Sequence, residues 1–243
     1  KTPTAQQLYT SVPGTSFDQV PNPDLKPESV KSYEIGARAD LGWGAFALTG
    51  FYSDYDDFIA GFQFVPGPDP MKLYITSLNL SSLKVFGVEA SAEVEAYDNL
   101  FLRTALSWTK AAQIPSEGAD EIAWNNAQPF KAVNGIRYED PGLGIGVELI
   151  HTFEAGFRRA SSEADLTTEN YHVFDVVASY QPYDWVTLRA GVFNIFDQRY
   201  LPSAAVAAYS TPEVPSASVA NGNPIEARIA PGINVTLSLS LQF

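Results

Sequence analysis

The sequence predicts an all-β protein: a transmembrane antiparallel β-barrel, of which this chain forms the C-terminal part with about nine strands. Three observations lead to this fold class. Apolar and polar residues alternate with period two through most of the chain, no convincing amphipathic helix is visible, and short and long connections between the alternating stretches follow one another in turn. No uncharged apolar run is long enough for a membrane-spanning helix.

The alternation is clearest at the C-terminus, where residues 233–243 place Ile, Val, Leu and Phe on one phase and Asn, Thr, Ser and Gln on the other. Period two is typical of a strand with one apolar and one polar face. The same pattern recurs, in chain order, at 33–40, 44–59, 86–96, 100–108, 128–139, 144–158, 171–182 and 186–192.

The opposite phase of these strands carries charge, which indicates a wet interior beneath a lipid-facing apolar surface. The charged residues on that phase are Glu89, Glu93, Arg103, Lys131, Arg137, Glu148, Asp175 and Arg189. We expect Glu89, Arg103 and Arg189 to contact water or another domain inside the barrel.

The connections alternate in length, as expected when periplasmic turns are short and extracellular loops are long. The short connections are 40–44, 96–99, 139–144 and 182–185, and the long ones are 60–76, 110–127, 159–170 and 200–228. Aromatic residues gather near the predicted strand ends, as in interfacial girdles. They are Trp43, Tyr97, Trp108, Tyr138, Tyr183 and Trp185.

An odd number of strands cannot close an antiparallel barrel, and an open sheet edge in lipid is costly. Residues 1–29 are too rich in proline and turn-forming residues to supply another spanning strand. We therefore expect 1–29 to be an extracellular loop segment and 30–243 to hold the membrane strands of a larger barrel.

Composition excludes several function classes. The formal net charge of −13 argues against nucleic-acid binding, and the absence of cysteine excludes disulfides and thiolate metal sites. No catalytic triad, carboxylate pair in a cleft or phosphate-binding glycine loop stands out, so we expect no enzymatic activity.

Two boxes near the N-terminus resemble TonB-dependent outer-membrane receptors: "KTPTAQQLY", with Pro3, and "NPDL", which is Asn22, Pro23, Asp24 and Leu25. "GVFNIFDQRYL" resembles the family's penultimate strand. "APGINVTLSLSLQF" resembles its last strand, with Phe243 as the C-terminal assembly signal. The resemblance implies a barrel of twenty-two strands occluded by an N-terminal plug, which is absent from this chain, and import driven through the inner-membrane protein TonB.

Within the family, the chain looks most like receptors for heme and hemoglobin. Thr2 replaces the alanine usual in the first box, and residues 10–21 lack the histidine that this subgroup often carries. The resemblance implies an outer-membrane location, contact with lipid and lipopolysaccharide, a heme protein as partner, and heme or a ferric complex as cargo rather than as a resident cofactor.

Candidate cargo contacts lie mainly in the predicted loops. They are Tyr9, Tyr55, Trp124, Asn125, Asn126, Arg158, Arg159 and Tyr209. Tyrosine is one of the side chains that ligate heme iron. His151 and His172 share their phase with apolar residues, so we place them on the lipid-facing side rather than at a ligand. Packing within a loop is the alternative for Trp124, and solvent exposure is the alternative for the two arginines.

The acidic run at 54–57 lacks the spacing of a calcium loop, so no metal site is predicted. Heme import is the preferred function. The alternatives are a receptor for a ferric siderophore or another scarce nutrient, a passive porin-like channel, an outer-membrane hydrolase and a soluble β-sandwich.

Overall fold

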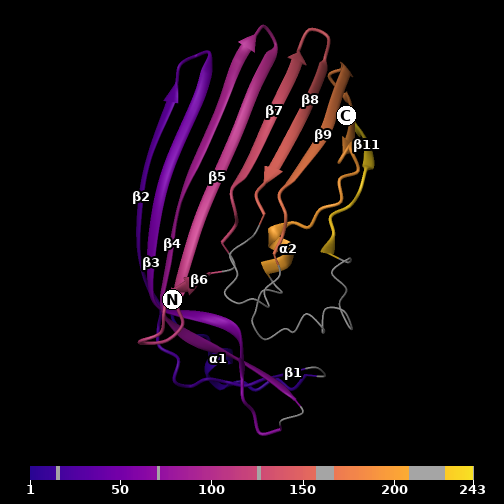
Figure 1. Ribbon diagram of the computed structural model, residues 1–243. Helices are drawn as coiled ribbons and strands as arrows, with labels where there is room; N and C mark the ends of the chain where they lie inside the picture. The colour runs from indigo at the N-terminus through magenta and orange to yellow at the C-terminus, as the bar shows by residue number, and fades with distance from the viewer. Residues whose placement is uncertain (15–16, 70–71, 125–126, 157–166, 208–227, 243) are drawn as a thin grey trace. The chain divides into compact units, whose positions relative to one another are not determined.

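In the computed structural model the chain forms a long, mainly antiparallel sheet (Figure 1). The structure describes residues 1–14, 17–69, 72–124, 127–156, 167–207 and 228–242. In chain order the elements are α1 (Ala5–Tyr9), β1 (Phe17–Gln19), β2 (Ser29–Asp40), β3 (Gly44–Val65), β4 (Leu73–Tyr97), β5 (Leu100–Ile114), β6 (Ile122–Ala123), β7 (Lys131–Asp140), β8 (Ile145–Glu154), β9 (Tyr171–Tyr183), β10 (Val186–Phe193), α2 (Ser203–Ala207) and β11 (Asn234–Leu241).

The strands follow one another in the sheet almost as they do in the chain. The order is β11-β10-β9-β8-β7-β5-β4-β3-β2, while the short strands β1 and β6 pair with β4 and β5. This path of nine strands agrees with the predicted number. The sheet is open, with β2 and β11 at the two ends of the path.

The chain divides into two compact units, and β3, β4 and β5 contribute residues to both. Unit 1 comprises 1–33, 51–86 and 110–127; unit 2 comprises 34–50, 87–109 and 128–243. Unit 1 has a small core of buried apolar residues. These are Leu25, Ile59, Ala60, Tyr74, Ile75, Leu80, Leu83 and Ala111.

Strand register in unit 2 separates an apolar face from a polar face. One row of paired residues runs across the sheet on the apolar face. It consists of Leu102, Ile136, Leu149, Val176, Val192 and Val235. Leu102, Ile136 and Val235 are 43%, 50% and 63% exposed, so this face is not covered by protein. Such extensive apolar exposure indicates contact with lipid or with another protein.

The short connections form tight turns at one end of unit 2, at the top of Figure 1. Gly42 and Gly144 adopt φ values of 82° and 65°, and Asn99 adopts 65°. Glycine and asparagine are the residues that tolerate this left-handed region best. The sequence thus supplies the backbone freedom that each turn needs.

Two predicted connections prove shorter than expected. Most of the predicted loop 60–76 is strand, because β3 continues to Val65 and β4 begins at Leu73. Similarly, β5 continues to Ile114. Ile75 and Tyr74 are neighbours in β4 and are both buried, so apolar residues fall on both phases there and the alternation that marks the other strands is lost. The helices α1 and α2 were also missed, since each has only five residues.

Aromatic side chains are exposed at the short-turn end of unit 2, as predicted. Trp43, Tyr97, Tyr138, Tyr183 and Trp185 are between 41% and 74% exposed. Trp43 contacts Phe46 edge to face, with ring centroids 5.6 Å apart. Among the described residues, no helix has the length and apolar character needed to cross a bilayer.

Candidate functional site

The "NPDL" box packs against strand β4 in unit 1. Asn22 Nδ2 donates to the Ser77 carbonyl oxygen at 3.0 Å. The Asp24 amide donates to Asn22 Oδ1 at 3.1 Å, which closes a local turn. Leu25 is 7% exposed. The Asn22 side chain therefore fixes the turn, and the Leu25 side chain at its end is buried in the core of unit 1.

Residues just after the box are held by Asn79 of β4. The Lys26 amide donates to Asn79 Oδ1 at 2.8 Å, and Asn79 Nδ2 donates to the carbonyl oxygens of Lys26 and Asp57 at 3.0 and 2.7 Å. Glu28 Oε2 accepts from the Ile59 amide at 3.1 Å. These bonds attach the N-terminal segment (residues 1–28) to β3 and β4, so the box has a structural role here.

The first box forms α1, directly after Pro3. Thr4 Oγ1 accepts from the Gln7 amide at 3.3 Å, and Gln7 Oε1 accepts from the Thr4 amide at 2.9 Å, which makes a capping box. Gln7 Nε2 also donates to Ser77 Oγ at 3.3 Å. Tyr9 ends the helix with 73% of its surface exposed, so it is accessible to a ligand.

Two predicted cargo contacts, Tyr55 and Trp124, meet through Phe58. The Tyr55 and Phe58 ring centroids lie 5.5 Å apart, and those of Phe58 and Trp124 lie 5.7 Å apart, both edge to face. The Trp124 amide donates to the Ala111 carbonyl oxygen at 3.1 Å. Sequence reasoning missed Phe58, because only the structure shows that its ring lies between those of Tyr55 and Trp124. Tyr55, Phe58 and Trp124 are called the aromatic cluster below.

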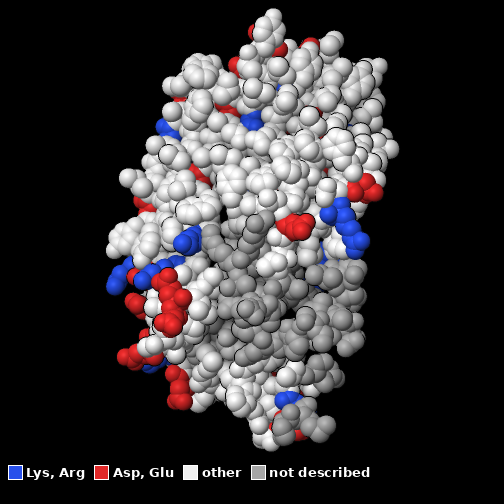
Figure 2. Space-filling view, viewed as in Figure 1, with Lys and Arg blue, Asp and Glu red and all other residues white. Residues whose placement is uncertain are grey.

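The polar face of unit 2 carries paired charges. Arg137 Nη2 lies 3.2 Å from Glu93 Oε1 and its Nη1 lies 3.5 Å from Glu139 Oε2. Arg103 Nε pairs with Glu148 Oε1. Figure 2 shows acidic and basic side chains close together, with broad uncharged areas between them.

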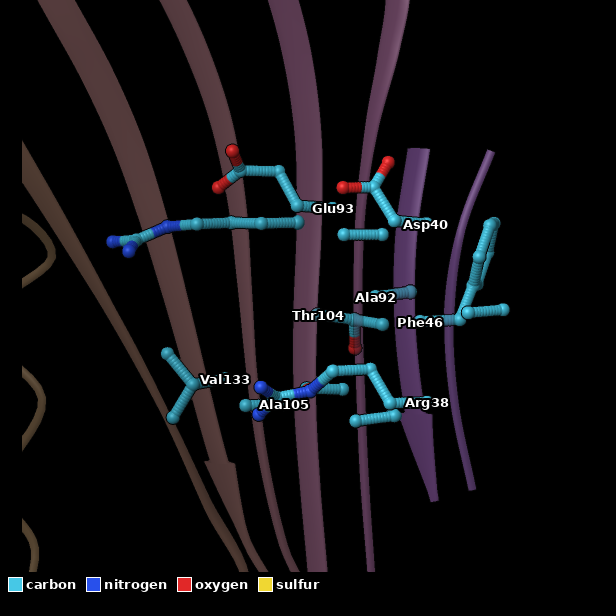
Figure 3. A pocket seen from close by; sticks show the side chains of 13 residues that line it. Arg38, Asp40, Phe46, Ala92, Glu93, Thr104, Ala105 and Val133 are labelled. Carbon is cyan, nitrogen blue, oxygen red and sulfur yellow. The ribbon is translucent and has the colours of Figure 1, made fainter. Parts of the chain in front are cut away.

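An open hollow of about 530 Å³ lies on this sheet between β2 and β7. Arg38, Asp40 and Glu93 reach into it, with small residues such as Ala92 and Ala105 between them (Figure 3). Arg38 and Asp40 form no ion pair with any residue that the structure describes, whereas Glu93 pairs with Arg137. Charges of both signs therefore line the hollow.

A buried carboxylate on the same face holds the start of α2. Glu154 is 6% exposed, and its Oε1 accepts from the Ser203 amide at 2.9 Å. Lys131 Nζ lies 3.8 Å from Glu154 Oε2. Burial, together with the carboxylates of Asp175 and Glu154, raises the pKa of Tyr200 in the following connection. Sequence reasoning missed this cluster, because Glu154 and Ser203 are 49 residues apart in the chain.

The motif that resembles the penultimate strand forms a turn anchored by Asn194, which is 3% exposed with φ of 51°. Its Oδ1 accepts from the Gln198 amide at 2.8 Å, and its Nδ2 donates to the Pro231 carbonyl oxygen at 3.1 Å. Asp197 Oδ1 accepts from the Ile233 amide at 2.9 Å. The motif thus positions the chain that enters β11.

The other predicted site residues lie outside the described part of the chain. These are Asn125, Asn126, Arg158, Arg159, Tyr209 and Phe243. His151 and His172 lie on the apolar face, as their phase predicted. Within the described residues, no three His, Cys, Asp or Glu side chains are grouped to hold a metal ion.

The family described as "TonB dependent receptor-like, beta-barrel" matches residues 1–195. The "Probable hemoglobin and hemoglobin-haptoglobin-binding protein 4" of Haemophilus influenzae is 25% identical over 286 residues, covering 100% of this chain and 27% of that protein. The "Hemoglobin-haptoglobin utilization protein B" of Neisseria meningitidis serogroup C is 25% identical over 232 residues, covering 82% of this chain and 28% of that protein.

Among solved structures, the copper transporter OprC superposes with a TM-score of 0.74 at 19% identity, covering 100% of this chain and 35% of that chain. This likeness shows the fold alone. The chain spans between a quarter and a third of the length of the two curated relatives. These relatives are binding and utilization proteins, in agreement with the expectation that this chain is not an enzyme. Because the family match covers most of the sequence, the chain belongs to the TonB-dependent receptor-like β-barrels.

Proposed function

We propose that this chain is the C-terminal barrel portion of an outer-membrane receptor that imports heme, or iron from heme proteins, with energy supplied through TonB. The observation that carries the proposal is the similarity, over the whole chain, to a protein named for binding hemoglobin. Cargo is bound and released, so heme is substrate here and not a resident cofactor.

The aromatic cluster supports the choice of cargo. Porphyrin is a flat apolar ring, and aromatic side chains pack against such rings in stacked or edge-on arrangements. Phe58 already contacts both Tyr55 and Trp124, which lowers the entropy cost of binding. The Tyr55 phenol supplies a side chain able to ligate iron. Tyr9, exposed at the end of α1, is a further contact on the same unit.

The exposed apolar face supports placement in a bilayer. Its rows of Leu, Ile and Val have no protein cover, and aromatic residues border it at the short-turn end. Exposed apolar bands with aromatic girdles are the features by which barrels contact lipid. The short turns of unit 2 then face the periplasm.

The polar face supports a plug inside the barrel. Arg38 and Arg189 lie on this face without an ion-pair partner among the described residues, and Glu89 lines a second hollow there. Such groups need water or charges from another domain. Arg103, also expected to face the plug, is paired with Glu148 instead.

The test is a heme titration of the detergent-purified full-length receptor, followed by the Soret band, with a ferric siderophore as competitor. Wild type should show a saturable, stoichiometric band that the siderophore does not displace. Trp124→Ala should weaken heme binding by about tenfold, while Trp185→Ala, in the short turn between β9 and β10 of unit 2, should leave it unchanged. Tyr55→Phe should shift the band if the phenol ligates iron.

A folded receptor without a Soret band would overturn heme import and favour the ferric-siderophore alternative. Equal affinity in wild type and Trp124→Ala would keep heme as cargo and remove the aromatic cluster from the binding site.

A further inference from the structure

Four polar side chains form a continuous hydrogen-bonded chain across the apolar face of unit 2. They are Thr104 of β5, Asn134 of β7, His151 of β8 and His172 of β9. Thr104 pairs with Asn134 in the sheet, and Asn134 pairs with His151. The rows beside them are apolar, such as Leu102, Ile136 and Leu149. Polar groups at this position require a physical reason.

The direction of the hydrogen bonds follows from the groups involved. Thr104 Oγ1 donates to Asn134 Oδ1 at 2.9 Å, so the amide nitrogen of Asn134 is the donor to His151 Nδ1 at 3.3 Å. His151 then carries its ring proton on Nε2 and donates to His172 Nδ1 at 3.0 Å. With Nδ1 accepting, neutral His172 carries its proton on Nε2. The chain therefore ends in one N–H donor.

Aromatic neighbours hold the two imidazoles in place. His151 stacks on Phe174 with centroids 4.6 Å apart, and His172 lies 4.8 Å from the Phe153 ring. His172 is exposed, and Nε2 has no acceptor among the residues that the structure describes. It is the second residue of β9, at the end where the long connections begin.

We propose that His172 is a binding site for the phosphate oxygen of an outer-leaflet lipid, oriented through His151, Asn134 and Thr104. The donor lies on the lipid-facing surface, near the outer ends of the strands, which is the level at which phosphorylated headgroups meet the barrel. Phosphate is a strong acceptor and pairs well with an imidazole N–H. Packed acyl chains would cover the adjoining apolar rows.

Two alternatives fit the geometry less well. A soluble phosphate ion would have to bind beside Phe153 and Phe174 on an apolar face, and it has no acyl chains to cover the adjoining apolar rows. A transition metal would find two imidazoles but no third ligand of the His, Cys, Asp or Glu type among the described residues.

The test measures lipid retained by the full-length receptor in native mass spectrometry, after incubation with bis-phosphorylated lipid A or its dephosphorylated form. His172→Leu removes the donor and suits an apolar face, while His172→Gln restores an N–H. Tyr180→Leu, on the same phase of β9 toward the short-turn end, is the matched control. Folding of each variant is checked by heat-modifiable migration in electrophoresis.

The phosphorylated lipid should be retained by wild type, His172→Gln and Tyr180→Leu. In His172→Leu the amount of retained lipid should fall about tenfold, which is the loss expected for one charge-assisted hydrogen bond. Equal retention by His172→Leu, or equal retention of the dephosphorylated lipid, would overturn the proposal. Displacement by millimolar inorganic phosphate would assign the site to a soluble anion instead.

The inference rests on the proposed membrane placement but not on heme as cargo. Failure of wild type to fold in detergent or lipid would overturn both. A folded receptor that binds heme and shows no lipid preference would overturn only this inference.

Discussion

Replacing Asn79 by alanine should release the N-terminal segment from the strands that hold it. The substitution removes three hydrogen bonds, two to the backbone of Lys26 and one to the Asp57 carbonyl oxygen. The Lys26 groups are exposed and can turn to water, so each of their two bonds contributes about 0.5 kcal/mol to docking, while the Asp57 bond joins β4 to β3 and does not enter the docking equilibrium. The sum of the two Lys26 bonds, about 1 kcal/mol, corresponds to a change of about fivefold in the docking equilibrium.

Hydrogen exchange of the full-length receptor in detergent measures this directly, through the protection of backbone amides near Lys26 and Glu28. We expect their exchange to be about fivefold faster in Asn79→Ala if local release governs it. Ser82→Ala on the same strand is the control, because that side chain forms no hydrogen bond with any residue that the structure describes. Unchanged protection in Asn79→Ala would refute the structural role assigned to Asn79 and the box it holds.

Two further predictions concern other parts of the chain. Asn194→Ala leaves Gln198 and Pro231 without their partner and places alanine at φ of 51°. It should therefore lower the free energy of unfolding by about 3 kcal/mol. Urea titrations followed by heat-modifiable migration in electrophoresis measure this change. A loss below about 1 kcal/mol would contradict the anchoring role of Asn194. The Gly14 amide, and then Lys72, hold the pKa of Asp18 below its usual range. The ionised Asp18 carboxylate therefore stabilises the folded state. This stabilisation is complete above the pKa that Asp18 has in the unfolded chain and is lost as pH falls through its lower pKa in the folded chain. Protection of the β1 amides from hydrogen exchange should therefore drop below about pH 4. Asp18→Asn should abolish that pH dependence. A pH dependence that persists in this variant would contradict its assignment to Asp18.

Much of unit 2 could be predicted from the sequence because its strands obey one simple rule. Each strand there has one uncovered apolar face and one polar face, so the phase of Leu102 and Arg103, or of Leu149 and Glu148, can be read from alternation alone. The short turns were equally visible, since Gly42, Asn99 and Gly144 supply left-handed backbone conformations.

Unit 1 was predicted less well because its strands are packed by other parts of the same chain. Ile75 and Tyr74 are both buried although they are neighbours in β4, so alternation does not mark that strand. The resemblance of the "NPDL" box indicated a family, but not that Asn22 bonds to β4 or that Leu25 is buried.

The sequence by itself determined the fold class, the strand phases and the family resemblance, since each depends on residues close together in the chain. Only the tertiary structure decided which distant residues meet: Trp124 with Phe58, Glu154 with Ser203, and His151 with His172. The physical reason is that sheet register and loop return bring these side chains within hydrogen-bond or van der Waals distance, and neither leaves a periodic signal in the sequence.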